Sequence, residues 1–173
     1  WLDNTKRLPN INWTISLDAT GGEAEMIRSG TIWDTVSNNA MELFKVSRSV
    51  NIGTVITALN VLHLAELFWF ANHCKRFGEH NNGGSHILSI CNFPKHFSPY
   101  NWPDHVKPYV IERLGQARQD AEQDSQHEIL DTLINNINKT SHDFIAWGRF
   151  LSHNEALDNI RDEDFINNLI TVP

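Results

Sequence analysis

The sequence predicts an α/β protein in which a three-stranded parallel sheet, formed in the order β-α-β-α-β, is followed by a helical C-terminal region. Three observations predict this class. Apolar, β-branched runs alternate over the first ninety residues with segments whose apolar residues recur at helical spacing. The connections are short and favour parallel strands joined by right-handed crossovers. After residue 100, every apolar pattern is helical.

The three strands are predicted at residues 11–19, 50–59 and 86–91. In the first, INWTISLDA, every second residue is apolar. The second, VNIGTVITAL, is nearly continuous and β-branched, as in strands that are covered on both faces. No strand is predicted on the outer side of the first one. We therefore expect the chain to be half of a larger parallel barrel, and to form a homodimer through the edge of its first strand when it is alone.

Two helices are predicted between these strands. Residues 31–46 are amphipathic, with Thr31 as the expected N-cap, and a second helix is expected to start at Asn60 and to be capped by it. The glycine-rich stretch before Thr31 is predicted to be a loop. The stretch GEHNNGG, residues 78–84, is predicted to be a polar loop before the third strand.

Three more helices are predicted from the apolar residues of 106–117, 129–137 and 144–151. The stretch ARQDAEQDSQ between the first two is expected to be a solvated charge run or an exposed turn. We accordingly divide the chain into a half-barrel segment, residues 1–100, and a helical extension packed on it, residues 101–173.

Composition excludes several classes of partner. The net charge is −7, with no basic stripe to displace counterions from nucleic acid, and no apolar run reaches the roughly 18 residues of a membrane span. No signal peptide is visible, so we expect a cytoplasmic protein whose two cysteines, Cys74 and Cys91, are buried thiols. The chain begins at Trp1 rather than Met, and we expect it to be a piece of a longer reading frame.

Four motifs follow one another in the first half of the chain. The first is a strand that ends in Ser16-x-Asp18, and the second is an acidic loop that leads to Arg28-x-Gly30 and to a helix opening with TIWDTV. The third is a strand that ends in VITALN, and the fourth is the segment LAEL that follows it. In this order they resemble the second half of the radical SAM barrel, the fold of enzymes that cleave S-adenosylmethionine (SAM) at an iron–sulfur cluster. The C-terminal EALDNIRDEDF is similar to the tail of members with a short SPASM-like or twitch extension.

The resemblance implies a partial TIM-like barrel with SAM at the carboxyl ends of its strands. Ser16 would then contact the ribose or methionyl part of SAM, and Asp18 would orient the substrate or bond to neighbouring backbone. Arg28 would hold the methionyl carboxylate through two parallel hydrogen bonds. Thr57 and Asn60 would lie at a position that recognises the nucleoside. The intact enzyme would act on a peptide or a small metabolite.

Each of these residues also has a structural interpretation. Ser16 and Asp18 would satisfy backbone donors of the following loop. Arg28 would be a surface arginine paired with Glu25 or Asp34. Asn60 would simply cap a helix.

The sequence also departs from the family. It lacks the Cys-x-x-x-Cys-x-x-Cys loop that holds the [4Fe–4S] cluster, so the cluster would belong to the intact protein, and this chain alone is expected to be inactive. The segment GGE at residues 21–23 follows the wrong strand for the family's SAM-binding glycine motif. The SAM-binding role of that glycine motif is therefore not assigned to residues 21–23.

Two other classes of function remain open. One is a non-catalytic α/β module that assembles through its first strand, and the other is a metal-dependent hydrolase. The histidines at positions 80, 86, 96 and 105 fit no zinc spacing, and Asp18, Glu23 and Glu25 offer only a weak case for a hard cation.

Overall fold

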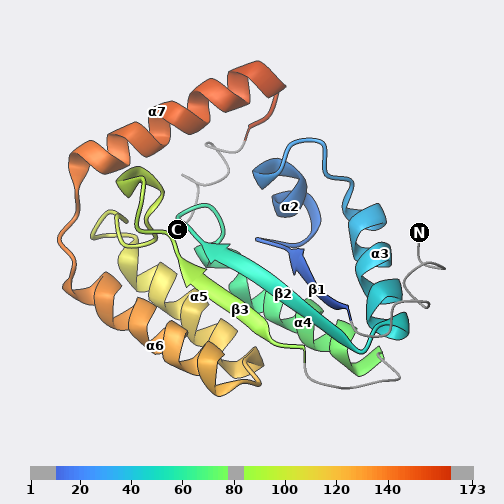
Figure 1. The fold of residues 1–173 in the computed structure, drawn as a ribbon. Coiled ribbons are helices and arrows are strands. Elements are labelled where there is room, and N and C mark those ends of the chain that lie inside the picture. Colours follow the sequence, from blue (N-terminus) through green and yellow to red (C-terminus); the bar gives the residue numbers. More distant parts are fainter. Residues whose placement is uncertain (1–10, 78–83, 165–173) are drawn as a thin grey trace.

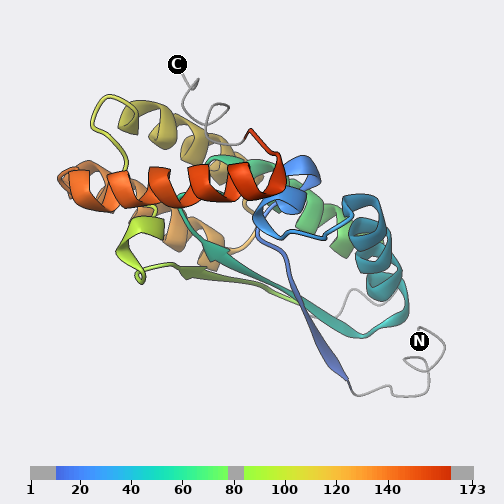
Figure 2. The same ribbon diagram turned by 90° about the horizontal axis from the view of Figure 1, so that it is seen from above.

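The computed structural model describes residues 11–77 and 84–164, and it consists of a parallel sheet with helices packed on one face (Figures 1 and 2). The strands are β1 (Asn12–Ser16), β2 (Ser49–Ile56) and β3 (His86–Ile90), in the order β1-β2-β3, and both pairings are parallel. This confirms the predicted α/β class and the parallel order of the strands. Each strand ends earlier than predicted.

The two faces of the sheet differ in burial. Val50, Ile52 and Ile56 of β2 are at most 2% exposed and pack into the core, whereas Val55 of the opposite face is 46% exposed and Ile87 of β3 is 48% exposed. The alternation continues in β1, where Thr14 and Ser16 are exposed. Within the described residues, one side of the parallel sheet is thus uncovered, although parallel sheets are normally buried on both faces.

The connection from β1 to β2 contains two helices, α2 (Gly21–Ile27) and α3 (Trp33–Val46). The prediction of a loop at α2 is wrong. The prediction that Thr31 caps the next helix is also wrong, because α3 begins at Trp33 and the Glu25 carboxylate of α2 accepts its backbone N–H at 2.7 Å. A side chain of one helix therefore satisfies a free donor at the start of the next.

The connection from β2 to β3 starts with a 3₁₀ turn, η1 (Val61–His63), and continues as α4 (Leu64–Phe77). Asn60 precedes η1, but its side chain caps neither element, so the predicted cap is wrong. Helix α4 contributes Leu67, Phe68 and Ala71 to the core, all fully buried, and packs against α3.

The described part of the chain after β3 is mainly helical, as predicted. It comprises the 3₁₀ turn η2 (Lys95–Phe97), α5 (Lys107–Asp120), α6 (Asp124–Lys139) and α7 (Phe144–Arg161). Helix α5 packs on α4, α6 packs on α5 and β3, and α7 contacts η2. Residues 117–126, expected to be a solvated charge run or an exposed turn, form the end of α5 and the start of α6, and the expectation is wrong for Ala117 and Gln126, which are completely buried.

No helix in the described part of the chain is long and apolar enough to cross a membrane.

Candidate functional site

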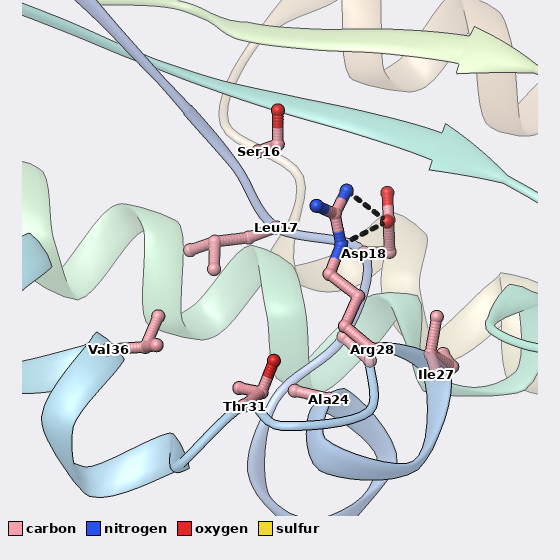
Figure 3. Close-up of a pocket in the computed structure, with 9 residues that line it drawn as sticks. Ser16, Leu17, Asp18, Ala24, Ile27, Arg28, Thr31 and Val36 are labelled. Atoms are coloured by element: carbon pink, nitrogen blue, oxygen red, sulfur yellow. Dashed lines mark hydrogen bonds and ion pairs between the residues drawn. The ribbon is translucent and has the colours of Figure 1, made fainter.

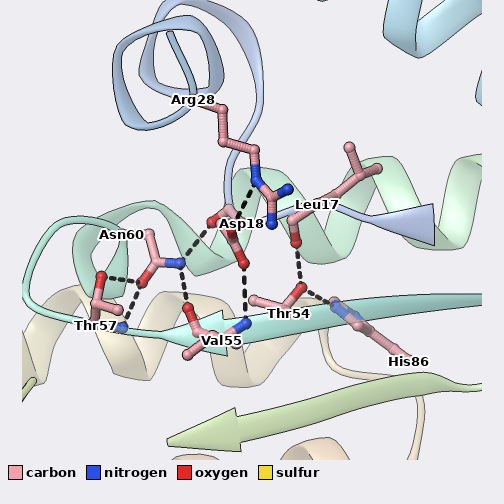
Figure 4. A network of polar contacts seen from close by, with 8 residues as sticks. All are labelled: Leu17, Asp18, Arg28, Thr54, Val55, Thr57, Asn60 and His86. Carbon is pink, nitrogen blue, oxygen red and sulfur yellow. Dashed lines mark hydrogen bonds and ion pairs between the residues drawn. The ribbon is translucent and has the colours of Figure 1, made fainter. Parts of the chain in front are cut away.

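An ion pair lies at the carboxyl end of β1. Oδ2 of Asp18 accepts hydrogen bonds from Arg28 Nε at 3.0 Å and from Arg28 Nη2 at 2.7 Å (Figure 4). Oδ1 of Asp18 accepts the backbone N–H of Val55 at 3.0 Å. The Asp18 side chain is 14% exposed and that of Arg28 is 50% exposed. The partner of Arg28 is therefore Asp18, rather than Glu25 or Asp34.

A cavity of about 200 Å³ opens beside this pair (Figure 3). Its apolar wall comes from Leu17, Ala24, Ile27 and Val36, and Thr31 adds a hydroxyl. Asp18 and Arg28 supply the charged groups of the lining. This combination of an apolar lining with few polar groups is typical of small-molecule sites.

The Arg28 guanidinium is only partly used by Asp18. The ion pair occupies the edge formed by Nε and Nη2, and no described residue accepts a hydrogen bond from Nη1. The second edge, formed by Nη1 and Nη2, presents two parallel donors, which is the arrangement that binds a carboxylate or phosphate in bidentate fashion. The site can therefore accept an anionic group without breaking the bond to Asp18.

Ser16 lines the edge of the same cavity. It is the last residue of β1, is exposed, and is in register with Gly53 of β2. Its hydroxyl points away from Leu17 and Val36 (Figure 3), toward the uncovered face of the sheet. Ser16 thus joins the cavity to that face.

Asn60 and Thr57 lie in the same network but are engaged within the protein. The Asn60 amide donates to the carbonyls of Asp18 at 2.7 Å and Val55 at 2.8 Å, and its oxygen accepts from the N–H of Thr57 at 2.7 Å and its hydroxyl at 3.3 Å. Asn60 is only 1% exposed. The Asn60 side chain thus ties the ends of β1 and β2 together, and the Thr57 hydroxyl accepts the N–H of Leu59 at 3.1 Å. The predicted contact of either side chain with a ligand stays a prediction.

A second polar chain, which the sequence analysis missed, runs behind this site. His86 is 2% exposed, its Nε2 lies 2.8 Å from Thr54 Oγ1, and Thr54 Oγ1 donates to the carbonyl of Leu17 at 2.5 Å (Figure 4). On the other side, His86 Nδ1 lies 3.3 Å from the amide nitrogen of Gln126. Since the Thr54 proton is committed to Leu17, His86 must donate from Nε2 and accept at Nδ1.

Burial, followed by the positive charge of Lys75, lowers the pKa of His86 to about 4. His86 is therefore neutral at pH 7 and is fixed in one tautomer. The hydrogen bonds through Gln126, His86 and Thr54 connect α6 to Leu17, the residue before Asp18. They therefore help to hold Asp18 in position. A histidine at the start of an otherwise apolar strand was the signal in the sequence that could have indicated a buried polar partner.

The described residues bring together no group of three or more His, Cys, Asp and Glu side chains that could hold a metal ion. Asp18 pairs with Arg28, Glu25 bonds to Trp33, and Glu23 lies 3.8 Å from His63. The four histidines that fit no zinc spacing in the sequence are also separated in the fold, with His86 in the core and His105 exposed, whereas His80 lies outside the described residues.

The two cysteines have different environments. Cys74 is fully buried in α4, and burial raises its pKa to about 12. Cys91, directly after β3, is half-buried, so the prediction of two buried thiols holds for Cys74 alone.

Comparisons with models of protein families, with curated proteins and with solved structures found no match for this chain.

Proposed function

We propose that this chain is part of a radical SAM enzyme and forms half of its TIM-like barrel, with the cavity beside Arg28 receiving the methionyl end of SAM. The observation that carries the proposal is the free edge of the Arg28 guanidinium at this cavity, at the carboxyl end of a parallel strand. Parallel α/β barrels collect their ligands at that end. The motifs from Ser16 to Asn60 that resemble the family surround the same place.

The residues present fit part of SAM. The free guanidinium edge suits its carboxylate, and the apolar wall suits its methylene groups. A cavity of about 200 Å³ is smaller than the roughly 300–1,000 Å³ of complete ligand pockets, so the nucleoside would extend over the uncovered sheet face past Ser16. When bound, SAM would supply the radical chemistry, while Arg28 and Ser16 hold and orient it.

The residues do not fit a [4Fe–4S] cluster. Such a cluster needs at least three thiolates in this family, and the chain has two cysteines, one of which is a buried, protonated thiol. We therefore expect this chain to bind SAM weakly and to have no turnover alone. In the intact enzyme the substrate would be a peptide or a small metabolite.

Isothermal titration of SAM into this chain and its variants tests the proposal. Arg28→Ala is expected to weaken binding by about tenfold or more, and Arg28→Lys to restore it only in part, because an ammonium cannot form the paired bonds. Arg118→Ala is the matched control, since Arg118 forms a comparable exposed pair with Asp131 far from the cavity.

Adenosine, which lacks the carboxylate, provides a second control and should bind the wild type and Arg28→Ala equally. A folded chain that does not bind SAM, or that binds it equally with and without Arg28, would refute the proposal. Circular dichroism of each variant verifies that it is folded.

A second candidate function is a non-catalytic module that forms a homodimer through the edge of β1. It is supported by the uncovered sheet face and by the outer side of β1, which pairs with no strand among the described residues. Sedimentation velocity over a range of concentrations tests it. A concentration-dependent dimer that persists without SAM binding would favour the module, and a monomer at every concentration would exclude it.

A further inference from the structure

Arg149 is a positive charge without a partner in an acidic chain. Of the lysine and arginine side chains of the described residues, seven lie within 4.0 Å of a carboxylate, and five do not: Arg48, Lys75, Lys95, Lys139 and Arg149. Arg149 of α7 is exposed, and no carboxylate of residues 11–77 or 84–164 comes within that distance of it. With a net charge of −7, the chain has more than enough carboxylates to pair it.

Two histidines, His153 and His96, lie close to Arg149. His153 follows one helical turn later on the same face of α7. The His153 ring lies 5.9 Å from the ring of His96, which belongs to η2 and follows the exposed Lys95. Two segments more than fifty residues apart in the chain therefore bring two imidazoles and a guanidinium to one place.

An aromatic ring fixes this arrangement. Phe97 lies 4.5 Å from the His96 ring and 5.2 Å from that of His153, meeting the latter edge to face. It also packs edge to face on Phe150, which is fully buried in α7. The two histidines are thus positioned by the core.

The charge of His96 depends on its surroundings. The pKa of His96 is lowered, first by partial burial and then by the positive charges of His153 and Arg149. An anion beside the cluster would favour the protonated imidazole and would therefore oppose this shift.

The cluster also lies where ligands bind in parallel sheets. Turn η2 follows β3, and the carbonyl of Phe97 accepts the N–H of Ala58, just beyond β2, at 2.9 Å. Figure 1 shows the strands pointing toward the side of the molecule where α7 lies. This is the carboxyl edge of the sheet, the usual location of ligand sites in open α/β folds.

We propose that His96, Arg149 and His153 form a binding site for an anionic group, a carboxylate or a phosphate, on a ligand that reaches the carboxyl edge of the sheet. The inference does not rest on the proposed function, because the cluster is separate from the Asp18–Arg28 pair and requires no SAM.

The site is tested by titrating the chain, labelled with ¹⁵N, with inorganic phosphate and in parallel with acetate at constant ionic strength. The NMR signals of the His96 and His153 rings should shift and saturate, and the anion should raise the pKa of His96. Tighter binding of phosphate would identify a phosphate ligand, and tighter binding of acetate a carboxylate. Either result supports the site.

Arg149→Gln should weaken the binding of the preferred anion by about tenfold, as expected for the loss of a charge-assisted contact. Arg118→Gln removes an equally exposed guanidinium elsewhere and should leave binding unchanged. Shifts that grow linearly without saturating, or an equal effect of both substitutions, would overturn the proposal. The backbone spectrum of each variant establishes that it is folded.

Discussion

Replacing His86 with glutamine should change how the stability of the fold depends on pH. His86 is buried and neutral, and its pKa falls from the ordinary 6.5 to about 4 in the folded chain. Above pH 6.5 the histidine is neutral in both the folded and unfolded states, and it contributes no pH dependence. Between pH 6.5 and pH 4 the unfolded chain binds a proton that the folded chain resists, so stability is lost as the pH falls.

The size of this effect follows from the two pKa values. Their difference corresponds to a loss of about 3 kcal/mol in the free energy of unfolding between pH 7 and pH 4. This is a large part of the roughly 5–15 kcal/mol that stabilises a typical domain. Glutamine can still donate a hydrogen bond toward Thr54 but does not titrate, so the variant should lose about 3 kcal/mol less on acidification than the wild type.

Urea unfolding at pH 7 and at pH 4, for the wild type, His86→Gln and His105→Gln, measures this difference. His105 is exposed, and its substitution is the control for the loss of a histidine outside the core. Comparing each variant with itself at two pH values removes the constant cost of repacking at position 86. If His86→Gln and the wild type lose equal stability on acidification, the assignment of a buried neutral histidine is refuted.

Two further predictions concern the buried groups. Asn60→Ala removes four hydrogen bonds at the ends of β1 and β2 and should lower the free energy of unfolding, measured in urea, by about 3 kcal/mol. The control Asn159→Ala removes one exposed hydrogen bond and should lower it by less than about 0.5 kcal/mol. Equal losses in the two variants would contradict the network around Asn60. In the folded chain at pH 8, a thiol reagent should label Cys91 quickly and Cys74 only at the rate of unfolding, because burial holds the pKa of Cys74 near 12. Cys91→Ser should abolish the fast labelling, and fast labelling that persists in this variant would show that Cys74 is accessible.

The sequence predicted the strands and most of the helices because their apolar patterns are strong. The alternation in INWTIS and the β-branched run of β2 identify strands without tertiary information. Helix α2 was missed because it is short and begins with Gly21 and Gly22, which favour a loop. Its stability comes from contacts that no local pattern records, such as the bond from Glu25 to the start of α3.

The site was only partly predictable. Position at the end of a strand correctly grouped Asp18, Thr57 and Asn60, since parallel strands end at one edge. The pairing of Asp18 with Arg28 and the inward turn of the Asn60 amide depend on distances across the fold. The contact between Gln126 and His86 joins residues forty positions apart, and a glutamine in a charge-rich stretch gives no local sign that it will be buried.

The bond between Gln126 and His86 also bears on how the chain can be divided. Residues 101–173 look like an addition to the half-barrel segment, yet α6 supplies the partner of His86 and α5 covers α4 with fully buried Val110 and Leu114. A chain shortened to residue 100 would expose that surface and leave His86 Nδ1 to water. The two segments are therefore expected to unfold as one cooperative unit, and the boundary between them marks a change of secondary structure, with no independent folding on either side.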